Sequence, residues 1–251
     1  MCGTCGCGEG GVRVTEFGHG HGHVVDIEED ILGANDALAA ANRRALAEQG
    51  VLAVNLMSSP GSGKTTLLVR TLTDVGAELG MTVVEGDQET LLDAERIGAT
   101  GARVVQVNTG SGCHLDAPML ARAMTALAPA RGSVMVVENV GNLVCPALFD
   151  LGEAARVVVM SVTEGADKPL KYPHMFRTAD LVLLNKVDLL PYVDFDVAAC
   201  VEAVRRVRPG AEVFEVSATC GDGMDAWYAW LRSARSGQEG PRAGALIRRT
   251  R

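Results

Sequence analysis

The sequence predicts an α/β fold in which helices cover both faces of a mostly parallel sheet of about seven strands, giving three layers. Seven short apolar runs recur between residues 51 and 216, and several are almost continuously apolar, as in strands covered on both faces. Amphipathic stretches with helical spacing lie between most of these runs. Polar motifs follow several runs directly, and parallel sheets bind ligands at that end of their strands.

The order of the elements divides the chain into four parts. Residues 1–25 are Gly-rich and lack helical or strand periodicity, so we expect a flexible arm. Residues 26–50 have helical spacing, with Asp26 and Glu29 resembling a capping box and Gly50 a plausible stop. Residues 51–235 form the expected domain, and 236–251 a flexible tail. The expected strands are 51–57, 82–85, 103–107, 133–137, 156–162, 180–184 and 212–216, with helices at 64–79, 116–128, 194–206 and 222–235.

Composition excludes several classes of protein. The 251 residues are 47% hydrophobic and 22% charged, which argues against disorder over most of the chain. No uncharged apolar run approaches the ~18 residues of a membrane span, and the start lacks the pattern of a secretory signal. A net charge of −8 argues against nonspecific binding to nucleic acid. We therefore expect a soluble cytoplasmic protein.

A phosphate-binding loop is predicted between the first strand and the helix that follows. The segment from Ser58 to Thr66 reads SSPGSGKTT, which fits G-x-x-x-x-G-K-[ST] except that serine replaces the first glycine. Small residues let the backbone wrap a phosphate, Lys64 adds a point charge, and Thr65 is placed to bind Mg²⁺. The alternative is an ordinary Gly-rich turn. The candidate nucleotide-binding residues here are Gly61, Ser62, Gly63, Lys64, Thr65 and Thr66.

A second motif indicates that the base is guanine. Asn185-Lys186-Val187-Asp188 directly follows an apolar run. Asp188 can accept hydrogen bonds from guanine N1–H and the exocyclic amine, a donor pair that adenine lacks, so ATP should be rejected. Asn185 can help fix the base and the stem of Lys186 can cover its face. Ser217-Ala218, after the last run, fits a loop that closes over the base.

A GTPase also needs acidic groups near Mg²⁺ and the attacking water. Asp87 follows the second run and Glu138 the fourth, and we assign both to the Mg²⁺ and water region together with Thr65. Either carboxylate could instead cap a helix. The catalytic candidates are thus Lys64, Asp87 and Glu138, and the absence of a legible catalytic glutamine or arginine finger predicts slow intrinsic turnover.

Two cysteine groups are candidates for metal binding. Cys2, Cys5 and Cys7 offer three thiolates that suit Zn²⁺, Cu⁺ or Ni²⁺, the alternative being a chance cluster of exposed thiols. Cys113 and His114 follow the third apolar run and Cys145 lies beyond Glu138, on loops near the same edge of the sheet that could meet. These three residues form either an incomplete ligand set, to be completed by water or by a second copy of the chain, or buried structural residues.

The remaining candidates have simpler readings. His19, His21 and His23 form either a weak auxiliary metal site or a polar spacer. Cys200 and Cys220 have no apparent partners and are read as structural. Trp227, Trp230 and Leu231 recur at helical spacing and are read as packing residues.

Together these motifs resemble the HypB family of nickel-incorporation GTPases of [NiFe]-hydrogenase maturation. The resemblance covers nearly all of residues 1–235, and Ser58 in place of glycine is how that family usually reads. The sequence departs from the family in having only a run of three histidines, whereas some relatives have a long His-rich tract. The segments that carry the resemblance are MCGTCGCGEG, SSPGSGKTTLL, EGDQET, GCHLD, ENVGNLVCP, DKPLKYPHMFRTADLVLLNKVDLLPY and the final Ser-Ala loop.

The resemblance implies a three-layer P-loop GTPase domain of the SIMIBI class, which includes signal-recognition GTPases and the nitrogenase iron protein, and a nucleotide-dependent homodimer. It implies a tight nickel site on Cys2, Cys5 and Cys7, and a weaker nickel or zinc site at the dimer interface on Cys113, His114 and Cys145. Lys168 lies in a segment that would contribute across the dimer. The implied partners are a HypA-type nickel chaperone and the immature hydrogenase large subunit.

We therefore expect a GTP-hydrolysing nickel metallochaperone whose substrate is GTP and whose product is GDP. The metal ions that we expect it to bind are Mg²⁺, Ni²⁺ and Zn²⁺. Two alternatives stay open. One is the GTPase of urease maturation, which usually has a Cys-Pro-His metal motif. The other is a nickel storage or buffering protein with vestigial GTP binding. A kinase or ATPase is a more distant reading.

Overall fold

The computed structural model describes residues 23–87, 91–110 and 112–237, with side chains from residue 32 onward. Within this part of the chain, one sheet of seven strands has the order β3-β2-β4-β1-β5-β6-β7, and every neighbouring pair is parallel. The predicted fold class is therefore confirmed. The strands are β1 (Leu52–Ser58), β2 (Thr82–Asp87), β3 (Arg103–Asn108), β4 (Val134–Glu138), β5 (Ala155–Ser161), β6 (Leu181–Asn185) and β7 (Glu212–Glu215).

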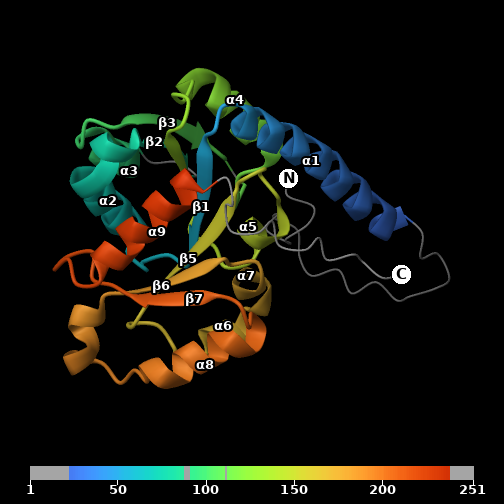
Figure 1. The fold of residues 1–251 in the computed structure, drawn as a ribbon. Helices are drawn as coiled ribbons and strands as arrows, with labels where there is room; N and C mark the ends of the chain where they lie inside the picture. The colour runs from blue at the N-terminus through green and yellow to red at the C-terminus, as the bar shows by residue number, and fades with distance from the viewer. Residues whose placement is uncertain (1–22, 88–90, 111, 238–251) are drawn as a thin grey trace.

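Helices cover both faces of this sheet (Figure 1). One face carries α2, α3 and α9, and the other carries α1, α4, α5, α7 and α8. The short α6 packs against α8. The bounds are α1 (His23–Glu48), α2 (Lys64–Leu79), α3 (Leu92–Gly98), α4 (Ala117–Leu127), α5 (Cys145–Leu148), α6 (Lys168–Lys171), α7 (Pro173–Arg177), α8 (Val197–Val207) and α9 (Met224–Ser236), with a 3₁₀ helix at Val187–Tyr192.

The core follows from the alternation of side chains along the strands. In β1, Val54 and Leu56 pack under α2 and α9, whereas Ala53 and Met57 belong to the clusters on the opposite face. All seven residues of β1 are buried, because both faces of this central strand are covered. The continuous apolar runs in the sequence are thus explained by two-sided burial.

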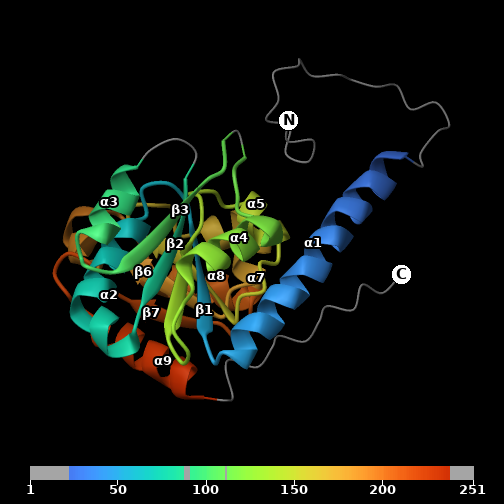
Figure 2. The same cartoon turned by 90° about the horizontal axis from the view of Figure 1, so that it is seen from above.

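The long helix α1 lies beside α4, and Figure 2 shows its N-terminal end extending past the body of the domain. Its C-terminal half is fixed by buried polar contacts: Asn42 Nδ2 donates to the carbonyls of Ala117 and Leu151, both at 3.0 Å. The predicted capping box at Asp26 is wrong, because the helix begins at His23 and Asp26 lies inside it. Gly50, two residues past the end, has φ +63° and closes the turn into β1.

The topology places the binding edge of the sheet. The chain leaves β1 toward β2 on one side and later crosses from β4 to β5 on the other side of β1, so the carboxyl ends of β1, β4 and β5 form a switch point. No helix in the described part of the chain combines the length and the apolar character that crossing a membrane requires.

Candidate nucleotide and metal sites

The phosphate loop lies at this switch point, between β1 and α2. Gly63 has φ +89°, and a Cβ there would lie 2.6 Å from Nδ2 of Asn185, so no other residue fits without displacing that side chain. The loop opens on a pocket of about 410 Å³. Its lining is residues 58–66 together with Asp93, Arg96, Gly141 and Lys186. The N–H groups at the start of α2 therefore face a space that suits an anion.

Lys64, Thr65 and Glu138 meet beneath the loop. Nζ of Lys64 and Oγ1 of Thr65 each lie 2.6 Å from Oε1 of Glu138. Glu138 is only 1% exposed, and its other oxygen, Oε2, is buried without a hydrogen-bond partner among the described residues. An orphaned carboxylate oxygen beside a hydroxyl is the donor set that Mg²⁺ prefers.

Glu85 joins this group, although the sequence alone assigned it no role. It is the register partner of Glu138 on the neighbouring strand and is 2% exposed. Burial, reinforced by the carboxylates of Glu138 and Asp87, raises the pKa of Glu85 to about 8. The sequence signal that could have identified Glu85 as a functional residue is its place as a carboxylate inside an apolar strand. Asp87 ends the same strand, at the same edge of the sheet as Glu138.

The candidate guanine residues form one connected group at the ends of β6 and β7. Nδ2 of Asn185 donates to the Ser62 carbonyl at 3.0 Å, and its Oδ1 accepts from the N–H of Ala218 at 3.1 Å. Oγ of Ser217 donates to the Asp188 carboxylate. Asn185 therefore ties the guanine loop to the phosphate loop.

Lys186 completes the connection between the two loops. It adopts φ +64°, a conformation that is uncommon outside glycine, and its Nζ donates to the Gly61 carbonyl at 2.7 Å. The stem of the side chain thus crosses the space between the base motif and the phosphate loop.

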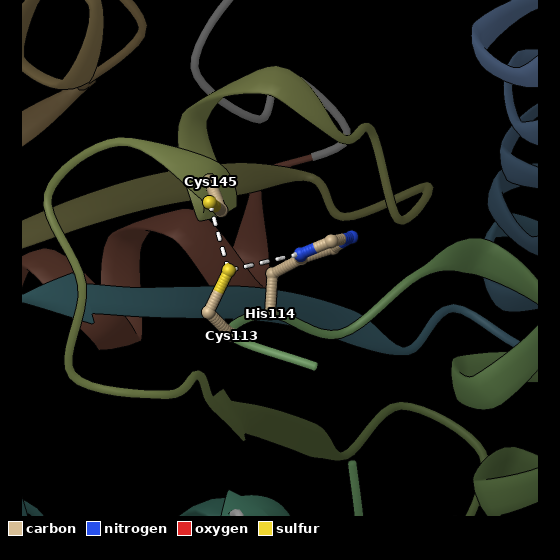
Figure 3. A group of neighbouring side chains, drawn as sticks. All are labelled: Cys113, His114 and Cys145. Atoms are coloured by element: carbon tan, nitrogen blue, oxygen red, sulfur yellow. Dashed lines mark hydrogen bonds between the residues drawn. The ribbon is translucent and has the colours of Figure 1, made fainter. Parts of the chain in front are cut away.

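Cys113, His114 and Cys145 lie together, as Figure 3 shows. The two sulfur atoms are 2.8 Å apart, and Sγ of Cys113 is 3.8 Å from Nδ1 of His114. All three ligand atoms lie within 4.8 Å of one another, close enough to hold one metal ion. Both cysteines are buried, and they lie 32 residues apart in the chain.

The surroundings of His114 favour the neutral form of its ring and orient it. The ring stacks on Phe149 with centroids 3.9 Å apart. Burial lowers the pKa of His114, and the nearby Asp116 carboxylate opposes this shift with a smaller effect. The lowered pKa favours the neutral imidazole, which is the form that binds metals.

A hydrogen-bonded residue connects the segment beside this cluster to β1, the strand that leads into the phosphate loop. Asn139 follows Glu138 directly and is fully buried. Its Oδ1 accepts from the N–H of Leu115 at 3.2 Å, and its Nδ2 donates to Oδ1 of Asn55 at 3.3 Å. The segment after Asn139 leads to Cys145, so one side chain braces both halves of the cluster beside the Lys64–Glu138 pair.

Lys168 was predicted to contribute across a dimer, and Cys200 and Cys220 were predicted to be structural. Lys168 forms an ion pair within its own chain with Glu164, which also accepts from Oγ of Ser59 at 2.6 Å. Cys200 is buried, with a pKa raised to about 11 by burial, as a structural thiol requires. Cys220 is exposed.

The aromatic residues on α9 do pack as expected. Trp227 and Leu231 are buried, and Trp230 stacks on Trp227 with centroids 5.5 Å apart. Cys2, Cys5, Cys7, His19 and His21 lie outside the described residues, and His23 is described only as the first residue of α1.

Comparison with known proteins adds independent findings. Residues 52–215 match the family described as CobW/HypB/UreG, nucleotide-binding domain. The hydrogenase maturation factor HypB of Rhizobium leguminosarum bv. viciae is 59% identical over 208 residues, covering 83% of this chain and 70% of that protein. The same factor from Escherichia coli K12 is 46% identical over 94% of this chain and 99% of its own length.

A solved structure agrees with these sequences. HypB from Helicobacter pylori in complex with nickel superimposes with a TM-score of 0.75 at 38% identity, covering 80% of this chain and 95% of that one.

Proposed function

This chain belongs to the HypB family of hydrogenase maturation factors, and from that premise we propose that it is a GTP-hydrolysing nickel metallochaperone. It would act in the cytoplasm and deliver Ni²⁺ to the immature large subunit of [NiFe]-hydrogenase. The proposal is carried by the position of Asn139, whose side chain links Leu115, next to a cluster of two thiols and an imidazole, to Asn55 on the strand that leads into the phosphate loop.

The nucleotide half of the proposal assigns roles to the chain's own groups. Lys64 exchanges Glu138 for oxygens of the β- and γ-phosphates, and the N–H groups of the loop bind the α- and β-phosphates. Asp87 orients a water that attacks the γ-phosphorus, the bond to the bridging oxygen breaks, and GDP and phosphate leave. Thr65, Asp87 and Glu138 would hold Mg²⁺, which supplies positive charge to the phosphate oxygens.

Guanine selectivity is assigned to Asp188. Its carboxylate pairs with Ser217 in the structure and would accept from guanine N1–H and the exocyclic amine, while adenine would leave it unpaired. Asn185, Lys186, Ser217 and Ala218 hold the two loops in place around the base. We therefore expect GTP and GDP to bind and ATP to be excluded.

In this proposal Ni²⁺ is the cargo of the cluster formed by Cys113, His114 and Cys145. Two thiolates and one neutral imidazole suit Ni²⁺ or Zn²⁺, and the three ligands leave room for further ligands. We propose that a second copy of the chain supplies them in a nucleotide-dependent homodimer. Cys2, Cys5 and Cys7 are proposed to form a tighter nickel site, and a HypA-type nickel chaperone to be the exchange partner.

Coupling between the halves requires that nickel bind one nucleotide state more tightly than the other. Glu138 and Asn139 are consecutive, so any shift of Glu138 when Lys64 leaves it is passed to the Asn139 amide. That amide holds the N–H of Leu115, next to His114. The distance between the cluster's two halves would change with the nucleotide.

The test is a nickel titration of a variant in which Cys2, Cys5 and Cys7 are serine, with a GTP analogue and with GDP. We expect different affinities in the two states, and equal affinities would refute the coupling. Lys64→Ala distinguishes a storage protein: the full chain should still bind nickel, but hydrogenase activation should fail. Activation that survives Lys64→Ala would contradict the GTP-dependent role.

A further inference from the structure

A third cation lines the nucleotide pocket besides the two lysines of the sequence motifs. Arg96, on α3, is one of the pocket-lining residues. Its Nη1 lies 3.1 Å from Oδ1 of Asp93, and its Nη2 lies 3.3 Å from Oγ1 of Thr66. The side chain is 50% exposed, so the guanidinium is available to a ligand in the pocket.

The three cations of the described pocket lining point to different places. Lys64 is held by Glu138 below the loop, and Lys186 is held by the Gly61 carbonyl on the side of the guanine motif. Arg96 approaches from α3, which packs against α2. Arg96 is therefore the cation that α3 contributes to the described lining, where it lies beside Asp93 and Thr66.

The contact with Thr66 identifies which phosphate lies there. Consecutive residues of a helix point about 100° apart, so the side chain of Thr66 points in a different direction from that of Thr65, whose hydroxyl donates to Glu138. In a phosphate loop the lysine reaches the β- and γ-phosphates, the following hydroxyl binds Mg²⁺, and the backbone N–H groups hold the α- and β-phosphates. We therefore place Thr66, one residue beyond the Mg²⁺ position, on the side of the α-phosphate.

We infer that Arg96 binds a nonbridging oxygen of the α-phosphate of the guanine nucleotide, with Thr66 as its neighbouring donor. Nη1 keeps its ion pair with Asp93, which fixes the guanidinium, while Nη2 turns from Thr66 to the phosphate. Since Arg96 serves a nucleotide only if the pocket binds one, this role rests on the proposed function.

In this role Arg96 differs from an arginine that stabilises the transition state, because it contacts a phosphate that does not react. The α-phosphate is common to GTP and GDP and carries the same charge before and after γ-phosphoryl transfer. Loss of a contact to it weakens both nucleotides alike and acts on KM more than on kcat. One charge-assisted hydrogen bond corresponds to a change of about tenfold or more in Kd.

The experiment is a fluorescence titration with Mg²⁺-GTP analogue and Mg²⁺-GDP, together with steady-state GTP hydrolysis, on the full chain. The variants are Arg96→Gln, Arg96→Lys and, as matched control, Arg103→Gln, an exposed arginine at the start of β3. We expect Arg96→Gln to raise both Kd values by a similar factor of about ten, with a smaller change in kcat. Arg96→Lys should recover part of the affinity and Arg103→Gln should match the wild type.

Three results overturn the inference in distinguishable ways. Unchanged affinities for both nucleotides in a folded Arg96→Gln protein show that the arginine only forms an ion pair with Asp93. A fall in kcat with unchanged GDP affinity shows that it acts on the γ-phosphate. Failure of the wild type to bind either nucleotide removes the proposed function itself, and with it the ligand for Arg96.

Discussion

Replacing Glu85 by glutamine should make the nucleotide-free protein more stable at pH 8 than the wild type, and by less at pH 5. Burial and the neighbouring carboxylates raise the pKa of Glu85 to about 8, from a value of 4.5 in an unfolded chain. Between these two values the folded protein holds a proton that the unfolded chain releases. The free energy of unfolding therefore falls as pH rises through this window, and levels off above it.

The size of the effect follows from the same pKa. The difference of 8 − 4.5 = 3.5 units corresponds to at most about 5 kcal/mol, of which roughly 3–4 kcal/mol is lost between pH 5 and pH 8. Glutamine keeps the shape of the protonated carboxyl but does not titrate. The difference in stability between Glu85→Gln and wild type should thus grow by roughly 3–4 kcal/mol over that range.

The assay is urea unfolding at pH 5, 6, 7 and 8, with chelator and reductant present to keep the protein free of metals. Glu95→Gln is the control, because Glu95 is an exposed carboxyl on α3. Its curve should run parallel to that of the wild type. If Glu85→Gln also ran parallel, Glu85 would be charged in the folded state, and its predicted proton would not exist.

Three further predictions concern the metal cluster, the connection to it and the core. In the protein whose arm cysteines are serine, Cys145→Ser should weaken nickel binding by about 100-fold or more in a metal titration, while Cys200→Ser should leave it unchanged. Asn139→Ala should bring the ratio of nickel affinities with GTP analogue and GDP towards one, and a ratio equal to that of wild type would exclude Asn139 as the link. Trp227→Phe should cost about 1–2 kcal/mol in urea unfolding, because it removes the N–H that donates to Thr71 at 2.9 Å, and Trp227→Ala about 3–5 kcal/mol; equal losses would mean that the ring contributes nothing.

Local patterns were sufficient for most of the fold. The seven predicted strands lie within two residues of the observed ones, and the four predicted helices after the first strand lie within three. Burial on both faces produces apolar runs that a reader sees directly. The helices α3, α5, α6 and α7 were not predicted, because their four to seven residues are too few to show a helical period.

Contiguous motifs also indicated most of the nucleotide site. The loop from Ser58 to Thr66 and the Asn185–Asp188 segment each carry their residues in one stretch of chain, so spacing alone is informative. Glu85 and Arg96 were not assigned, since their relevance comes from neighbours on other elements: Glu138 on β4 for one, and Thr66 on α2 for the other.

The sequence by itself determined which chemical groups are present: soft sulfur and nitrogen ligands near the ends of strands, and a lysine and hydroxyl in a phosphate loop. Only the tertiary structure decided that Cys113 and Cys145 meet, 2.8 Å apart, and that Asn139 links Leu115 to Asn55 on β1. The physical reason is that strand order, not chain order, sets proximity. All neighbouring strands are parallel, so the loops after β3, β4 and β1 lie at one edge of the sheet, and β4 lies directly beside β1 although β2 and β3 come between them in the chain.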